Sequence, residues 1–361
     1  MVTRRPLSVI LAALAAIVVL GIPSVTARAA PQPGARAALK AAGTAARCAF
    51  TRNPYVMPRS VLRSCGYHFI HRAGVVALPG GGRSYVYYVG GHKVTYNVPP
   101  RGFNPLTATR RQLREYNLPA WRLLGGRRAW DRIMRPVRFT PPPLSLIEAP
   151  QKFAPNCHGA CWAGYVDTGH SNYNAVSANF VEPHISSAVC SNPLAEGTWV
   201  GLGGFHTGNL GQDGTAYGTG HPHGAWWEVL PSGPVYSSWT GSAGDNISAS
   251  TAWNTSSNKY DFAVIDGSHI LSPSEQGGGY DGTSAEFITE APGGDNLENF
   301  GSIPFTSAYS YYGSSSAHGV GQLPHVRQLM TNSNTGHTMA EPGPISGANS
   351  QNFTMNQRNC D

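Results

Sequence analysis

Apolar and polar residues alternate in short runs from residue 161 onward, and turns rich in Gly, Ser and Asn separate these runs. Alternation places successive side chains on opposite faces of a strand, so each run predicts a strand with one buried face. The clearest runs are residues 199–202, 225–230, 262–265 and 285–290. Many short strands joined by turns are typical of antiparallel sandwiches. The pattern therefore predicts an all-β domain over residues 151–361.

The stretch from residue 30 to residue 150 has a mixed pattern. Three runs predict short strands, at residues 67–70, 84–89 and 93–96. Thr109 and Gln112 have the spacing of a capping box, which predicts a helix that ends before Pro119. A second short helix is predicted over residues 127–134, and the prolines at 141–143 cannot continue regular structure. We therefore predict a small, separate α+β region that ends near residue 150.

The first 29 residues have the features of a secretory signal peptide. Arg4 and Arg5 form a basic start, residues 7–20 are apolar, and Ala27 and Ala29 fit the small-residue rule for cleavage after Ala29. No stretch approaches the run of about 18 apolar residues that a membrane helix needs. We expect a secreted protein without stable membrane insertion.

Charge is divided unequally between the two halves of the chain. Residues 1–150 carry 22 of the 26 Lys and Arg, whereas residues 151–361 carry 16 of the 19 Asp and Glu. Fields of opposite sign attract each other at moderate salt, so the basic half is expected to bind the acidic half. Because the acidic half would repel phosphates, the distribution argues against nucleic acid as a partner.

All six cysteines follow the predicted cleavage site. An even number in an exported protein predicts disulfides rather than a thiol nucleophile. Cys48 and Cys65 are expected to pair locally, and the other four allow three connectivities: Cys157, Cys161, Cys190 and Cys360. The Cys-His-x-x-Cys spacing at residues 157–161 lacks a second half, so we predict no metal site. Nothing in the sequence indicates an organic cofactor.

Carboxylates are the remaining candidates for chemistry, because neither a Gly-x-Ser-x-Gly nor a His-Glu-x-x-His motif occurs. Alternation places Glu286 and Glu290 on one face of their strand, and Trp226 and Glu228 on one face of theirs. A carboxyl beside Trp on a half-buried face has a raised pKa and can act as a general acid or base. Periodicity alone fits exposed acids on a polar face equally well.

Eight segments resemble, in the same order, the glutamic peptidases or eqolisins, which are secreted, acid-active endopeptidases. The segments are residues 162–166, 180–183, 199–204, 209–214, 225–231, 244–247, 285–290 and 300–305. Each is weak alone, but their common order is specific. Residues 104–108 and 115–119 also look like segments that precede related peptidase domains.

The resemblance implies a sandwich of two curved antiparallel sheets, of concanavalin-like or jelly-roll type, with a substrate groove on the concave face. It implies that Gln212 and Glu290 are the catalytic pair and that polypeptides are the substrates. Glu290 would act as general base and acid, and Gln212 would stabilise the oxyanion. Five further residues match substrate-binding positions, although packing in the core or at the rim is the alternative: Trp162, Trp199, Trp226, Glu228 and Glu286.

The sequence departs from the family pattern at Gly203 and Gly224, which stand where family members have acids. These departures put the orientation of the catalytic pair in doubt, so activity could be weak or its pH optimum shifted.

Two functions therefore stay open. The first is a monomeric acid endopeptidase whose basic residues 30–150 cover the groove as an intramolecular inhibitor. The second is a non-catalytic, lectin-like or peptide-binding sandwich at the cell surface. The basic segment could instead be a retained module that binds an anionic cell-surface polymer.

Overall fold

The structure is a computed structural model. It describes residues 54–150, 161–186, 190, 195–218, 221–277, 279–292, 297–313 and 316–360. The predicted signal peptide, Cys48 and Cys157 lie outside the described residues. Residues 43–361 form one compact unit, to which all of the described residues belong. None of the described helices is long and apolar enough to cross a membrane.

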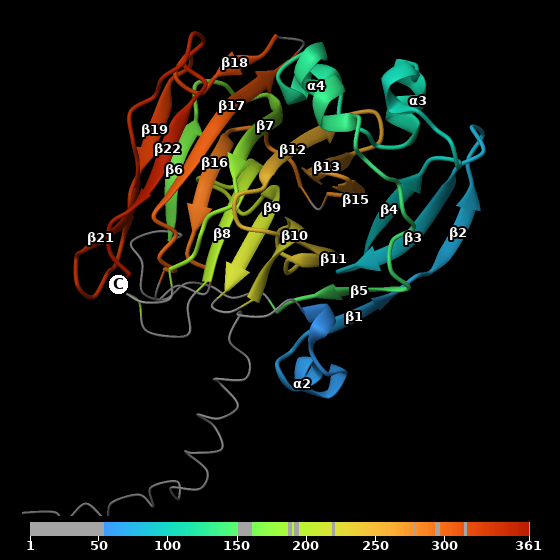
Figure 1. The fold of residues 1–361 in the computed structure, drawn as a ribbon, viewed down its shortest axis with the longest axis horizontal. Helices are drawn as coiled ribbons and strands as arrows, with labels where there is room; N and C mark the ends of the chain where they lie inside the picture. The colour runs from blue at the N-terminus through green and yellow to red at the C-terminus, as the bar shows by residue number, and fades with distance from the viewer. Residues whose placement is uncertain are drawn as a thin grey trace, which may run out of the picture. The chain divides into compact units, whose positions relative to one another are not determined.

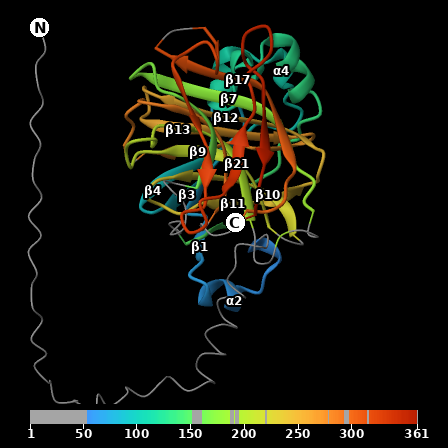
Figure 2. The same ribbon diagram turned by 90° about the vertical axis from the view of Figure 1, so that its left-hand side faces the viewer.

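Two antiparallel sheets face each other in a β-sandwich, which confirms the predicted fold class (Figures 1 and 2). In the described residues, the first sheet has nine strands in the spatial order β1 (His68–His71), β5 (Ser145–Glu148), β11 (Val235–Gly241), β10 (His221–Val229), β9 (Gly211–Gly218), β8 (Ala195–Leu202), β16 (Ala285–Glu290), β6 (Trp162–Asp167) and β19 (His325–Gln328).

The second sheet follows, over the same described part of the chain, the order β2 (Gly74–Ala77), β3 (Arg83–Val89), β4 (His92–Val98), β15 (Pro273–Gln276), β13 (Lys259–Asp266), β12 (Asn246–Asn254), β7 (Tyr173–Val181), β17 (Ser302–Tyr312), β22 (Phe353–Gln357), β21 (Thr338–Pro342) and β20 (Met330–Thr331). Two short strands lie off this path: β14 (His269–Leu271) pairs with β13, and β18 (His318–Gly319) pairs with β17.

Alternation along the nine-stranded sheet separates two apolar clusters, as the sequence pattern predicts. Val200 of β8, Trp227 of β10 and Phe287 of β16 are fully buried in the core between the two sheets. Their sequence neighbours Trp199, Trp226 and Ile288 belong to a different cluster. Because successive side chains of a strand point to opposite faces, this second cluster lies on the outer face of the sheet.

Short helices are confined to the N-terminal part of the described chain. They are η1 (Pro54–Val56), α2 (Arg59–Ser64), η2 (Pro105–Thr107), α3 (Arg110–Glu115), η3 (Trp121–Leu124) and α4 (Arg127–Met134). The predicted capping box is confirmed: the Gln112 N–H donates to Thr109 Oγ1 at 3.3 Å, and the Thr109 N–H donates to Gln112 Oε1 at 2.9 Å. Trp130 and Met134 of α4 pack in one cluster with Ile265 of β13, so this helix covers the outer face of the second sheet (Figure 1).

Residues on both sides of the predicted boundary near residue 150 contribute strands to the same sheets. In the nine-stranded sheet, Ile147 of β5 lies opposite Tyr236 of β11. In the other sheet, β4 pairs with β15, and the Tyr96 ring packs edge-on against Trp227 at 5.7 Å between centroids. Residues 68–148, which belong to the basic part of the chain, therefore contribute strands to both sheets of the sandwich.

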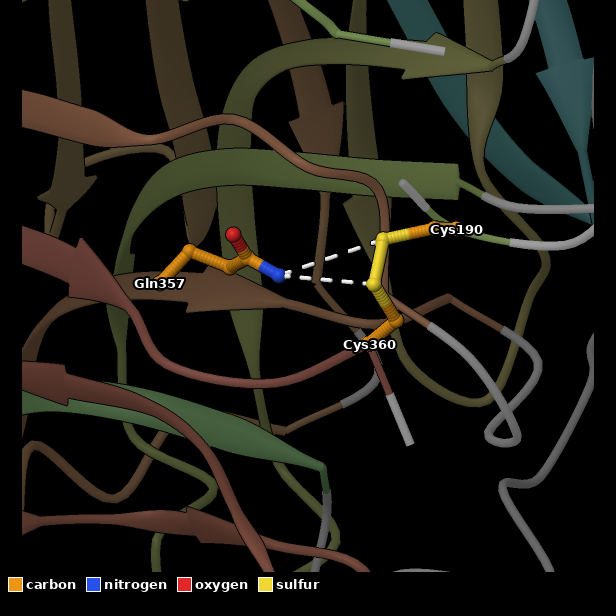
Figure 3. Close-up of a disulfide and its surroundings, with 3 residues drawn as sticks. All are labelled: Cys190, Gln357 and Cys360. Carbon is orange, nitrogen blue, oxygen red and sulfur yellow. Dashed lines mark hydrogen bonds between the residues drawn. A yellow bond between two sulfur atoms is a disulfide. The ribbon is translucent and has the colours of Figure 1, made fainter. Parts of the chain in front are cut away.

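A disulfide joins Cys190 to Cys360, with 5.7 Å between the Cα atoms (Figure 3). This bond is among the three connectivities left open by the sequence, and it closes a loop of 170 residues. The side-chain amide of Gln357 lies beside it, with Nε2 at 3.7 Å from the Cys360 sulfur (Figure 3). Cys65 and Cys161 are also disulfide-bonded.

Candidate active site

The floor of the candidate site is built on glycine positions of β8 and β9. A Cβ atom at Gly201 would lie 2.9 Å from the Trp199 ring and 3.3 Å from the Cβ of Gln212. At Gly214, which lies opposite Trp199 in the register, a Cβ would meet the Trp199 side chain at 2.8 Å. The missing side chains therefore make room for the Trp199 indole to lie along the sheet surface next to Gln212.

Glu290 lies at the other end of this indole. The Trp199 Nε1–H donates a hydrogen bond to Glu290 Oε2 at 3.0 Å. Trp162 packs edge-on against Trp199, with 4.9 Å between the ring centroids. Burial raises the pKa of Glu290, and hydrogen bonding by Trp199 and Trp162 to the charged form partly offsets this, which leaves the pKa at about 7. With this pKa, the Glu290 carboxyl can both bind and release a proton near neutral pH.

Gln212 is oriented by a second carboxyl. Gln212 of β9 and Glu228 of β10 lie opposite each other in the register, and the Gln212 side-chain amide donates a hydrogen bond to Glu228 Oε2. Both residues are nearly inaccessible to solvent, at 4% and 5% exposure. Burial and then the nearby Glu290 charge raise the pKa of Glu228, which reaches about 8 although the hydrogen bond from Gln212 lowers it. Glu228 is thus protonated in acid and holds the amide in place.

The two halves of the site therefore share one face of the sheet. Gln212 and Trp199 both lie beside Gly201, and Trp199 donates a hydrogen bond to Glu290. The Glu290 charge raises the pKa of Glu228, which is the hydrogen-bond partner of Gln212. The face assignment that alternation predicts for these strands is confirmed by the register.

Removal of the indole N–H is expected to raise the pKa of Glu290 above about 7, because the hydrogen bond from Trp199 favours the charged carboxylate. In Trp199→Phe, loss of a hydrogen bond to a charged group should move the titration midpoint upward by about one pH unit. Carboxyl ¹³C NMR titration measures this midpoint without any need for activity. Trp253→Phe is the matched control, since Trp253 stacks on Tyr280 of another region; equal midpoints in all three proteins would contradict the assignment.

Comparison with known proteins decides the family. Residues 160–341 match the model of the Peptidase A4 family. The chain belongs to the peptidase A4 family. As an eqolisin it is a glutamic endopeptidase, which hydrolyses peptide bonds. No curated protein matches the chain in sequence.

Solved structures of A4-type peptidases resemble this one. Scytalido-glutamic peptidase with a peptide-based transition-state analogue is 21% identical with a TM-score of 0.45, and the same peptidase with a transition-state analogue inhibitor is 20% identical with a TM-score of 0.46. SCP-B, a member of the eqolisin family in complex with the tripeptide Ala-Ile-His, is 21% identical with a TM-score of 0.43. Each match covers 55% of this chain and 98% of the other chain.

The sequence-predicted site residues of this A4 peptidase occupy different environments. Trp162 is partly exposed, whereas Trp199 is fully buried and Trp226 is 5% exposed. Glu286 is fully buried, and burial raises its pKa well above the ordinary value. Substrate contact by these residues and by Glu228 stays a prediction.

The two departures from the family pattern differ in their surroundings. Gly203 has a φ of +77°, which favours glycine, and a Cβ there would lie 3.0 Å from Asp281 Oδ1. A carboxyl from another segment thus lies beside the position where family members carry an acid. Asp281 is held in turn by the hydroxyls of Thr207 and Thr283, at 2.6 and 2.9 Å. Among the described residues, a Cβ at Gly224 would meet only the Tyr236 ring, at 3.6 Å.

Sequence reasoning missed Tyr236 and Tyr67, two buried tyrosines that belong to one apolar cluster with Trp199 and Trp226. The pKa of Tyr236 is raised by burial and then by Tyr67, Glu228 and Glu290. Tyr236 could have been found from its alternation in β11, but Tyr67 precedes β1 and joins this cluster through long-range packing. Among the described residues, no three His, Cys, Asp or Glu side chains are grouped as metal ligands.

Proposed function

We propose that the protein is a secreted, acid-active endopeptidase in which Gln212 and Glu290 are the catalytic residues. The observation that supports this most strongly is the carboxyl of Glu290, which is bound by an indole N–H and has its pKa raised to about 7 on the same sheet face as an oriented glutamine amide. The division into a signal peptide at residues 1–29, a basic region to residue 150 and a peptidase domain is part of the proposal, and the enzyme is expected to be a monomer.

Glu290 acts as the proton carrier. As a carboxylate it takes a proton from a water molecule, whose oxygen attacks the carbonyl carbon of the peptide bond. The proton then passes to the nitrogen of the leaving amine as the carbon–nitrogen bond breaks. Burial is the largest cause of the raised pKa of Glu290, about 7, so water that enters the groove with the substrate is expected to lower this pKa towards the acidic range. With its pKa lowered in this way, the single Glu290 carboxyl can both take and give a proton in acid.

Gln212 stabilises the negative oxygen that forms on the attacked carbonyl. An amide NH₂ group has two donor hydrogens, and the hydrogen bond to Glu228 uses one of them. The other is available to the oxyanion. The buried Oε1 of Gln212 has no hydrogen-bond partner among the described residues, so it can accept a hydrogen from the attacking water.

Trp226 supplies a third polar contact to the substrate. Its buried Nε1–H has no hydrogen-bond partner in the part of the chain that the structure describes. A buried donor of this kind is costly unless a ligand satisfies it. A carbonyl of the bound polypeptide is the partner that a peptidase groove provides.

Cleavage of an unfolded protein tests the proposal. The full chain is incubated with a reduced and alkylated substrate protein between pH 2 and 5 and at pH 7.5, and new amino termini are counted. Cleavage in acid with little cleavage at pH 7.5 is expected. No new termini at any pH, or a neutral optimum, would contradict it.

The proposal also holds that the basic region inhibits the enzyme in cis.

A further inference from the structure

The outer face of the nine-stranded sheet is covered in this structure. An antiparallel sheet of a sandwich usually packs one face on the core and leaves the other to water. Here, however, Trp199 is 0% exposed and Gln212 4% exposed, although both belong to the outer face. Something other than the sandwich core therefore excludes water from the candidate site.

The covering residues come from the start of the described chain. Leu62 of α2 and Tyr67 are 1% and 6% exposed, and both belong to one apolar cluster with Trp199 and Trp226. Three side chains of the same segment pack against this cluster: Tyr55, Met57 and Cys65. In Figure 1, α2 lies beside β1 at the lower end of the sandwich.

A hydrogen bond and a shared apolar cluster also tie this segment to the strand that carries Tyr236. The Tyr55 hydroxyl donates to the backbone oxygen of Tyr236 at 3.1 Å. Tyr67 and Tyr236 are both buried and belong to one apolar cluster with Trp199. Tyr67 is therefore part of the apolar cover on the sheet face that carries the proposed active site.

The rest of the basic region, residues 68–148, forms part of the sandwich itself. β3 and β4 place Tyr87 and Tyr96 in the main core, where Tyr96 packs on Trp227. β5 pairs with β11 at the edge of the nine-stranded sheet. Removal of residues 68–148 would expose this core and two sheet edges to water, which would destabilise the sandwich.

We propose that residues 54–67, rather than the whole basic region, close the groove, and that residues 68–148 stay in the sandwich of the active enzyme. This inference rests on the proposed function, because a closed groove matters only if Gln212 and Glu290 act on a substrate. It narrows the inhibitory element to a 14-residue segment whose side chains occupy the place of a polypeptide substrate.

The segment is held mainly by apolar contacts. The ion pairs between described residues stay within one half of the chain: His68–Glu148 and Arg127–Asp131 in the basic half, and Arg327 and Arg358 with Glu341 in the acidic half. Release of residues 54–67 is therefore expected to be insensitive to salt, unlike the attraction between halves that the charge distribution predicts.

Loosening the segment tests the inference in the full chain. Tyr67→Ala and Leu62→Ala each remove a buried apolar side chain from the cover, and either one suffices if the other fails to fold. Phe103→Ala is the matched control, because Phe103 is an aromatic residue of the same basic region but packs with Tyr116 and Phe139. The readouts are the initial rate of substrate cleavage at pH 4.5 without acid pretreatment, and acrylamide quenching of tryptophan fluorescence, which needs no catalysis.

We expect the initial rate to rise about tenfold or more in both cover variants, since losing a large buried side chain shifts such an equilibrium strongly. Quenching should rise in the same variants and not in Phe103→Ala. Unchanged quenching would overturn the inference, as would increased quenching without faster cleavage when acid-treated wild type is active. If quenching rises and no protein cleaves under any condition, the cover stands and the proposed peptidase mechanism fails.

Discussion

Glu290→Gln is expected to lower kcat by a factor of about 10² to 10⁴, with little change in KM, because the amide can neither take nor give the proton. Glutamine keeps the size of the side chain, and its Oε1 can still accept the hydrogen bond from Trp199. The change therefore isolates proton transfer from packing. Activity is measured at pH 4.5 in the full chain and in the Tyr67→Ala background, where opening the groove does not depend on self-cleavage.

Glu275→Gln is a closely matched control. Glu275 is 1% exposed, accepts a hydrogen bond from Trp227 Nε1 at 2.7 Å and has its pKa raised to about 8 by burial. It has the chemical surroundings of Glu290, but Trp227 points into the sandwich core rather than the groove. Glu275→Gln should retain kcat within a few-fold. A Glu290→Gln enzyme as active as Glu275→Gln would remove Glu290 from the mechanism.

The protein is expected to be more stable at pH 4 than at pH 7. Burial raises the pKa of several carboxyls, including Asp167, Glu228 and Glu275, each to about 8. A group with a raised folded-state pKa stabilises the fold fully below its unfolded pKa, and this stabilisation is lost as pH rises through the folded pKa. Each group lowers the free energy of unfolding by about 1.4 kcal/mol per pH unit in that window. The window runs from about pH 4 to pH 8 here.

Urea unfolding at pH 4, 5.5 and 7 measures this slope. Asp167→Asn should flatten it by about 1.4 kcal/mol per pH unit, because the amide cannot ionise. Its Oδ1 can still accept from Ser310 Oγ, which donates to Asp167 at 2.5 Å. Glu341 works in the opposite direction: Arg327 and Arg358 lower its pKa, so its small contribution is lost only as pH falls through that lowered value. Stability that rises from pH 4 to pH 7 would contradict the burial of neutral carboxyls.

Local patterns predict the elements and faces that local chemistry determines. The capping box of Thr109 and Gln112 marks the start of α3, and Pro136 follows soon after the end of α4. Alternation in β16 places Glu286 and Glu290 on one face, because the period of a strand is two whatever surrounds it. The family resemblance then supplied Gln212, which no periodicity singles out.

Long-range pairing could not be predicted from the same patterns. β4 pairs with β15 and β5 with β11, so the partners lie 181 and 89 residues apart at the pairs Val94–Glu275 and Ile147–Tyr236. A short alternating run shows that a strand exists but carries no information on which edge it joins. For this reason the sequence predicts a boundary near residue 150 and not one sandwich built from both parts of the chain. For the same reason it could not place Tyr67 in the apolar cluster with Trp199.

A double-mutant cycle tests the central claim most directly. The claim is that Gln212 and Glu290 work as one unit on the same carbonyl and water. Values of kcat are compared for the parent enzyme, Gln212→Ala, Glu290→Gln and the double variant at pH 4.5. Residues that act as a unit have non-additive effects, so the double variant should be no more than a few-fold slower than the slower single variant. If the two losses multiply, as they do for independent sites, the account is contradicted.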